Sequence, residues 1–139
     1  MKQAFVLFGL ATLLSIAAGR AADSSGIADA TAASRAWLSA VDAGQYGKSW
    51  DEAAAFFRQN VSKAGWEKAA SEARQPLGAL KTRELESAEP AHRLPGVPDG
   101  DYVVLTYHAS FAGRADATET VTPMRDADGQ WRVAGYFVK

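Results

Sequence analysis

Apolar residues recur at every third or fourth position from about residue 30 to residue 75, the spacing that places them on one face of an α-helix. A polar leader, DSSG at 23–26, precedes a first predicted helix, which Gly44 ends in the manner of a C-terminal glycine. YGK at 46–48 is predicted to be a turn, and a second helix to begin at Ser49, because SWDE at 49–52 has the form of a capping box. A third helix is predicted over about 62–75 and is closed by PLG at 76–78.

From residue 79 the apolar period changes to two, which predicts antiparallel strands at about 80–87, 102–111, 118–125 and in the C-terminal stretch. The first of these is polar and is expected at an edge of the sheet. EPAHRLPGVPDGD at 89–101 predicts a long loop, and DADG at 126–129 predicts the last hairpin turn. The predicted fold class is therefore α+β, with about three N-terminal helices packed against a curved, cone-like antiparallel sheet of about four strands.

The N-terminus has the layout of a secretory signal peptide. Lys2 precedes an uncharged apolar run from Ala4 to Ala18, and small residues follow around Arg20. A membrane anchor is the alternative, but this run is shorter than the roughly 20 residues that a spanning helix needs. The sequence thus predicts a signal peptide at 1–21, a single domain at 22–139, and a periplasmic or secreted protein without a membrane attachment.

Composition narrows the possible functions. Removal of residues 1–21 takes away Lys2 and Arg20 and no acid, so that 13 basic and 16 acidic residues leave a net charge of −3. That balance does not favour nucleic acid as a partner. The chain has no cysteine, which excludes thiol catalysis, and with two histidines a zinc site would need carboxylates. Phosphate-binding, dinucleotide-binding and hydrolase motifs are missing from the sequence, and we predict no cofactor and no metal.

Several motifs carry a family resemblance from about Trp37 onward. They are DxGxYxxSW at 42–50, Phe57, Trp66, RxPLG at 74–78, Arg83, LPGxPDGxY at 94–102, Phe111, ETV at 119–121 and DGxWRVxGY at 128–136. Through them the chain resembles a bacterial family known as domain of unknown function number 4019. The order of helices and curved sheet also resembles the cone-shaped fold of nuclear transport factor two, which implies a bent sheet around a long helix and a pocket at the wide end.

His108 is the first candidate for chemistry. It lies in the middle of a predicted strand, with Tyr107 on the opposite face. An imidazole that points into a cone could serve as a general base. We favour the alternative, a hydrogen-bonded or solvent-facing histidine, because no second acid or base is clearly aligned with it.

Glu119, Arg132 and Tyr136 form a second candidate group. If the last hairpin pairs Arg125 with Gln130, then Glu119 lies opposite Tyr136 and Arg132 opposite Pro123, all on one face of the sheet. Arg132 could then hold a carboxylate ligand. A shift of one residue would turn Glu119 to the other face, and the alternative role is a surface ion pair.

Two further features of the sequence can be explained by roles in the fold. Arg74 falls at the end of the third helix, where a cation can bond the last carbonyls. The loop at 94–100 could be a lid, or a brace over a sheet edge.

The leading functional hypothesis is a non-catalytic binding or interaction domain. A small apolar or amphipathic molecule would occupy the cone, or a protein partner, a second copy included, would meet the C-terminal strands. The candidate pocket residues are Trp37, Trp50, Tyr107, Trp131 and Tyr136. The alternatives are a small isomerase, dehydratase or hydrolase with His108 as base, assisted by Tyr107, Glu119 or Arg132, and a structural homodimer whose tryptophans fill its own pocket.

Overall fold

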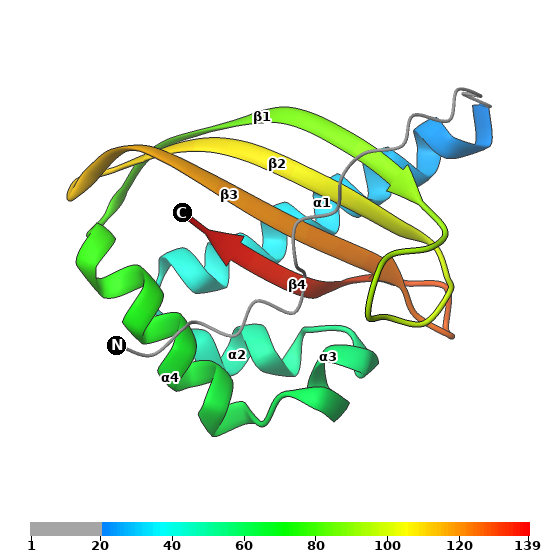
Figure 1. Cartoon of the computed structure of the whole chain (residues 1–139), viewed down its shortest axis with the longest axis horizontal. Coiled ribbons are helices and arrows are strands. Elements are labelled where there is room, and N and C mark those ends of the chain that lie inside the picture. The colour runs from blue at the N-terminus through cyan, green and yellow to red at the C-terminus, as the bar shows by residue number, and fades with distance from the viewer. Residues whose placement is uncertain (1–20) are drawn as a thin grey trace.

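Within residues 21–139, four helices precede four strands (Figure 1). The computed structural model describes residues 21–139, with side chains from residue 26 onward. The predicted signal peptide, except for its last residue, lies outside the described residues. The helices are α1 (Ala21–Asp42), α2 (Tyr46–Asp51), α3 (Ala55–Asn60) and α4 (Lys63–Arg74), followed by a 3₁₀ turn, η1 (Gln75–Leu77). The strands are β1 (Leu80–Ala91), β2 (Tyr102–Phe111), β3 (Arg114–Arg125) and β4 (Trp131–Val138).

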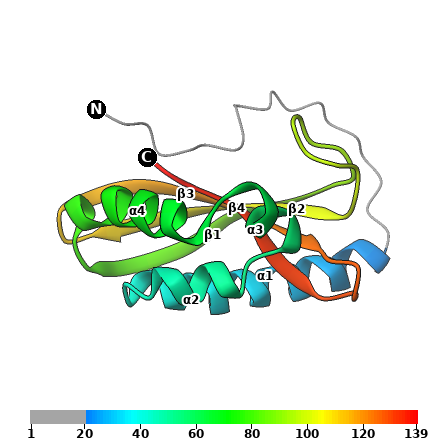
Figure 2. The same cartoon turned by 90° about the horizontal axis from the view of Figure 1, so that it is seen from below.

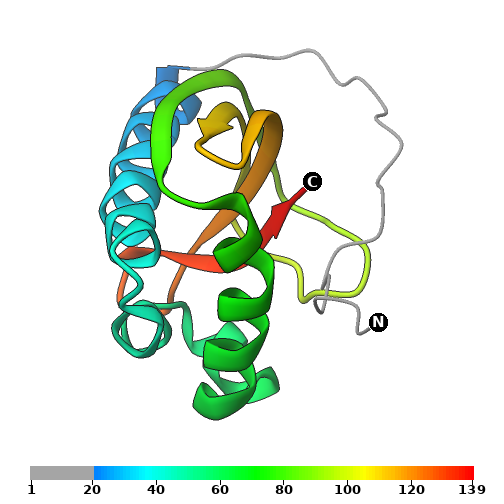
Figure 3. The ribbon, with the colours of Figure 1, turned by 90° about the vertical axis from the view of Figure 1, so that its left-hand side faces the viewer.

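The strands form one antiparallel sheet in the order β1-β2-β3-β4, so each strand pairs with its neighbour in sequence. The sheet is curved, and α1 lies across one of its faces (Figures 2 and 3). None of the described helices covers the opposite face (Figure 2). On the β4 side, α3 and α4 flank the sheet (Figure 1). This arrangement confirms the predicted α+β class and the four strands.

The helix prediction was partly wrong between residues 23 and 60. The polar leader at 23–26 is part of α1, and the stretch expected as one helix from Ser49 is divided into α2 and α3. No side chain caps α2 at Gln45. Ser49 lies inside α2 and is fully buried, where its Oγ donates to the Tyr46 carbonyl at 2.6 Å and accepts from Trp66 Nε1 at 2.8 Å. A tertiary contact therefore uses the hydroxyl that a capping box would need.

Other helix boundaries agree with the sequence. Gly44 has φ +73°, a left-handed conformation suited to glycine, and its N–H donates to the Val41 carbonyl at the end of α1. At the start of α4, the Ser62 hydroxyl accepts a hydrogen bond from the Gly65 amide at 3.1 Å. These positions fix where α1 ends and α4 begins.

β1 and β3 are longer than predicted, β2 has the predicted bounds, and the register of the last hairpin differs. β1 continues to Ala91 and includes Pro90, which an edge strand tolerates because it needs no partner on its outer side. In the final hairpin Arg125 pairs with Trp131, not with Gln130, and an irregularity at Thr122 and Pro123 shifts the pairs beyond it. Glu119 consequently lies opposite Val138, so the predicted pairs with Tyr136 and between Arg132 and Pro123 were wrong.

Aromatic side chains fill the space between the helices and the sheet. The Trp37 ring packs on Trp66 at 5.7 Å and on Tyr136 at 5.4 Å between centroids, and Phe57 meets Trp66 edge-on at 5.2 Å. Both of the deepest indoles are hydrogen-bonded through α2, Trp37 to the Ser49 carbonyl and Trp66 to the Ser49 hydroxyl. Trp37 of α1 and Trp66 of α4 thus meet in one core, and Ser49 of α2 is hydrogen-bonded to both indoles.

Candidate functional site

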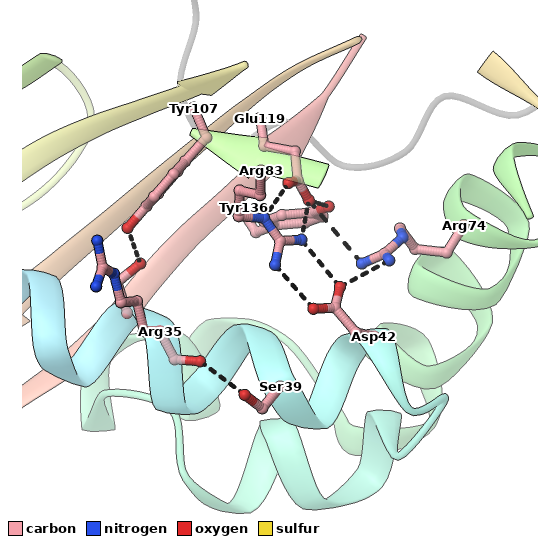
Figure 4. A network of polar contacts seen from close by, with 9 residues as sticks. Arg35, Ser39, Asp42, Arg74, Arg83, Tyr107, Glu119 and Tyr136 are labelled. Atoms are coloured by element: carbon pink, nitrogen blue, oxygen red, sulfur yellow. Dashed lines mark hydrogen bonds and ion pairs between the residues drawn. The ribbon is translucent and has the colours of Figure 1, made fainter. Parts of the chain in front are cut away.

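A partly buried arginine joins two carboxylates between α1 and the sheet (Figure 4). Arg83, on β1, donates from Nε to Glu119 Oε1 at 2.6 Å and from Nη2 to Oε2 at 3.1 Å. The same guanidinium donates from Nη1 to Asp42 Oδ2 at 2.8 Å and from Nη2 to Oδ1 at 2.9 Å. Glu119 is fully enclosed. One side chain therefore ties the end of α1 to β1 and β3.

Arg74 and Tyr136 complete this group, which we call the charge network: Asp42, Arg74, Arg83, Glu119 and Tyr136. Arg74 donates from Nη2 to Asp42 Oδ1 at 2.8 Å and stacks over the Phe111 ring at 4.8 Å. The Tyr136 hydroxyl donates to Glu119 Oε2. Arg74 Nη1 lies 3.9 Å from Glu119 Oε2, and its Nε and Nη1 are buried without a hydrogen-bond acceptor among the described residues.

The charges within the network balance. Two guanidinium groups face two carboxylates, and every pair is partly or wholly shielded from water. Burial by itself would raise the pKa of Asp42, but hydrogen bonds from Arg83 and Arg74 outweigh it and hold that pKa below the usual 3.8. Burial, together with the adjacent Glu119 charge, raises the pKa of Tyr136 well above 10, so this phenol stays protonated and acts as a donor.

A pocket of about 290 Å³ opens beside the network, between the end of α1 and the α4–η1 junction. The residues lining it are Val41, Asp42, Ala43, Gly44, Tyr46, Arg74, Gln75, Gly78 and Ala79. Of its two charged side chains, Asp42 is 22% exposed and Arg74 is 5% exposed. The pocket therefore presents a carboxylate that is held in position from behind by arginines.

The structure brings together two of the three residues predicted as the second candidate group. Glu119 and Tyr136 meet although the predicted register was wrong, because Tyr136 lies two residues from Val138, the partner of Glu119, and so projects from the same face. Arg132 is elsewhere. It binds Asp126 at 3.0 Å and Asp128 at 2.8 Å in the last hairpin, and Arg83 and Arg74 take the place it was predicted to fill.

His108 lies apart from the charge network. It pairs across the sheet with Thr118, whereas its neighbour Tyr107 pairs with Glu119, so His108 and Glu119 project from opposite faces. Its Nε2 lies 2.8 Å from Asp116 Oδ1, and both side chains are exposed. His108, Glu119 and Arg132, three of the residues proposed for the enzyme alternative, are thus not gathered at one site.

The five predicted pocket residues contribute mainly to the core. Trp37 and Tyr107 are buried, and the Tyr107 hydroxyl lies 3.2 Å from Ser34 Oγ. Trp50 and Trp131 are partly buried against the same core. Tyr136 borders a small groove of about 30 Å³ between α4 and β4, together with Trp66. Trp37, Trp50, Tyr107 and Trp131 line neither this groove nor the larger pocket.

Sequence reasoning missed Asp42, noted Arg83 near the end of the third helix without assigning it a role, and gave Arg74 a different role. Each residue is polar and stands at the end of a helix or on an edge strand, where a solvent-exposed role is the ordinary expectation. The one available signal was the family resemblance, because all five residues of the charge network belong to the motifs that carry it. The hydrogen-bonded partners within the network lie 17 to 41 residues apart, so their joint role is invisible in local spacing.

Two further observations concern the described residues. No helix among them is long and apolar enough to cross a membrane. No group of three or more histidine, aspartate or glutamate side chains in this part of the chain is placed to hold a metal ion.

Comparison with known proteins places the chain in a family. Residues 33–136 match the family described as "Protein of unknown function (DUF4019)". The chain belongs to this family. No curated protein matches the chain. In this DUF4019 protein the match runs from the middle of α1 to Tyr136 and thus contains the whole charge network and the whole lining of the larger pocket.

Proposed function

We propose that the mature protein is an exported, non-catalytic binding domain that takes a small polar ligand in the pocket beside Asp42. The observation that carries this proposal is the pocket itself, whose wall contains a carboxylate fixed by two arginines. Its volume of about 290 Å³ suits a small molecule. Export is supported by the layout of the N-terminal sequence.

The rigidity of the wall also favours binding. Asp42 accepts three hydrogen bonds from two guanidinium groups, so its carboxylate is already oriented before a ligand arrives. A group that is held in place loses little further freedom on binding, which increases affinity for a matching ligand. The aromatic residues are packed on one another, and this favours a polar ligand over the apolar one that the sequence suggested.

The geometry gives less support to an enzyme. Glu119 is sealed from solvent and engaged by Arg83 and Tyr136, so it has no access to a substrate proton. Tyr136 holds its proton far above neutral pH. His108 lies on the other face of the sheet beside Asp116. It lines neither the larger pocket nor the small groove described above.

A second candidate function is an interface with a protein partner, a second copy included, on the sheet face that no described helix covers (Figures 2 and 3). Thr106 and Thr120 pair on this face, as do His108 and Thr118, and all four are partly exposed. A face of this kind accepts a partner through hydroxyl and imidazole groups.

Native mass spectrometry of the protein recovered from the bacterial periplasm tests both candidates. We expect an added small mass that disappears on denaturation. Ala43→Leu, which places a larger side chain in the pocket wall, should abolish it. Ala36→Leu, an equal change on the exposed side of α1, should retain it. A bare dimer would favour the second candidate, and a bare monomer would contradict the proposal.

A further inference from the structure

We infer that the ligand of this pocket carries a primary ammonium group and that Asp42 binds it. This inference rests on the proposed function and adds the chemical class of the ligand. It depends on three features of the pocket: which charged atoms a ligand can reach, which hydrogen-bond positions are free, and which charge the surrounding helix ends favour.

The first feature is access. The side chain of Asp42 is 22% exposed, whereas Arg74, the other charged residue of the lining, is 5% exposed. The two nitrogens of Arg74 that lack an acceptor, Nε and Nη1, are enclosed by protein, so an anion in the pocket could not reach them without displacing other groups. A ligand therefore meets carboxylate oxygen before it meets guanidinium nitrogen.

The second feature is the number of acceptor positions on Asp42. An ionised carboxylate has about four of them, two on each oxygen. Oδ1 accepts from Arg74 Nη2 and Arg83 Nη2, and within the described part of the chain Oδ2 accepts only from Arg83 Nη1. One position on Oδ2 remains open to a donor. An ammonium N–H would fill it with a charge-assisted hydrogen bond.

The third feature is the electric field that the helix ends and charged side chains create in the pocket. The lining residues come from the last turn of α1, from the end of α4 with η1 and, at Tyr46, from the start of the six-residue helix α2. Two helix C-termini and one helix N-terminus therefore lie at this space. A helix C-terminus carries a partial negative charge and favours a cation, whereas a helix N-terminus carries the opposite partial charge. The formal charges of Arg74, Arg83, Asp42 and Glu119 cancel, and the two C-termini outnumber the N-terminus of the short α2, so the remaining partial charge favours a cation.

Tyr46 adds an aromatic surface to the same wall. It is partly buried and lines the pocket from the first turn of α2. An aromatic face attracts a cation in a site that is partly shielded from water. A small alkylammonium could therefore place its nitrogen near Asp42 and its methylenes near Tyr46.

Three probes of equal length separate the possibilities: butylammonium, butyrate and 1-butanol. Each is titrated into the mature protein while the backbone amide resonances of Gly44 and Gly78, two residues of the lining, are followed by NMR. We expect saturable shifts at both glycines with butylammonium only. Ala43→Leu should block them, and the matched Ala36→Leu should leave the dissociation constant unchanged.

Two variants test the assigned contacts. Asp42→Asn should weaken butylammonium binding at least about tenfold, the effect of losing one charge-assisted hydrogen bond. Because this change also disturbs two arginines, Tyr46→Leu provides a second test outside the charge network, with an expected loss of about three- to fivefold. The NMR spectrum of each variant reports whether it is folded.

The outcomes test the ammonium assignment separately from the proposed binding function. Binding of butyrate or 1-butanol in place of butylammonium would overturn the ammonium assignment and leave the binding function standing. Saturable binding that both variants leave unchanged would overturn the assignment to Asp42 and Tyr46. If none of the probes binds, the inference fails, and the proposed function fails with it only when native mass spectrometry also finds no ligand.

Discussion

Arg83 and Arg132 each bind two carboxylates, and a comparison of their surroundings shows what burial adds to the same chemistry. Arg83 joins Asp42 and Glu119, which lie 41 and 36 residues away, and its side chain is 13% exposed. Arg132 joins Asp126 and Asp128, which lie 6 and 4 residues away in one hairpin, and its side chain is 32% exposed. The first cluster connects α1, β1 and β3. The second lies within the last hairpin and reaches another element through one hydrogen bond, from the Ala55 amide of α3 to Asp126 Oδ2 at 3.3 Å.

The two clusters should therefore differ in energy. Water and salt screen an exposed ion pair, so its partners lose little when the pair is broken. A buried ion that loses its partner cannot regain water, and the folded state becomes less stable. We therefore expect the charge network to contribute more to the free energy of unfolding than the hairpin cluster does.

Breaking the buried cluster should have the largest effect. Glu119→Ala leaves Arg83 and Arg74 facing an empty space inside the protein, and we expect the free energy of unfolding to fall by about 3–5 kcal/mol. Urea denaturation followed by circular dichroism measures this change. Asp128→Ala in the hairpin is the matched control and should leave the midpoint close to that of the unsubstituted protein. Equal effects of the two changes would contradict the comparison.

Removal of the phenol hydroxyl should have a smaller effect that depends on pH. Tyr136→Phe takes one donor from Glu119 and should cost about 2 kcal/mol at neutral pH. Since the folded-state pKa of Tyr136 lies above the usual 10, the stability it contributes is fully present below pH 10 and is lost as the pH rises beyond that value. Urea unfolding between about pH 8 and pH 11 should show a flatter decline in the variant than in the parent. An identical decline in both would show that Tyr136 does not titrate as described.

A substitution in the exposed hairpin cluster should change the stability of the protein least. Arg132→Ala should change the free energy of unfolding by less than about 1 kcal/mol. Hydrogen bonds from Arg132 and from the Gln130 amide hold the pKa of Asp128 at about 2, below the usual 3.8. Without Arg132 this pKa should rise toward 3.8, which an NMR titration of the side-chain carboxyl carbons can follow. A pKa that stays near 2, or a loss of stability like that of Glu119→Ala, would remove the distinction between the two arginines.

Local patterns predicted the elements well where short-range chemistry controls them. Gly44 ends α1 and Ser62 caps α4, because a positive φ and a free hydroxyl act within a few residues. The prediction failed at Ser49, whose hydroxyl is used by Trp66, 17 residues away. The predicted register of the last hairpin was also wrong. Arg125 pairs with Trp131, so the loop is one residue longer than predicted, and the irregularity at Thr122 and Pro123 shifts the pairs beyond it again.

The candidate site was harder to predict from local sequence patterns. Glu119 and Tyr136 were predicted to share a face, and they do, although through a diagonal contact and not a direct pair. The choice of Arg132 as their cation was wrong, since proximity in sequence made it the obvious partner while Arg74 and Arg83 come from α4 and β1.

The sequence by itself determined the α+β class, the four strands and the family, because apolar period, turn residues and family motifs are local properties of the chain. Only the tertiary structure decided that two arginines and two carboxylates share one enclosed space beside a pocket. The reason is physical: the pairing of charges depends on distance and burial, and folding sets both by bringing the end of α1 against β1 and β3.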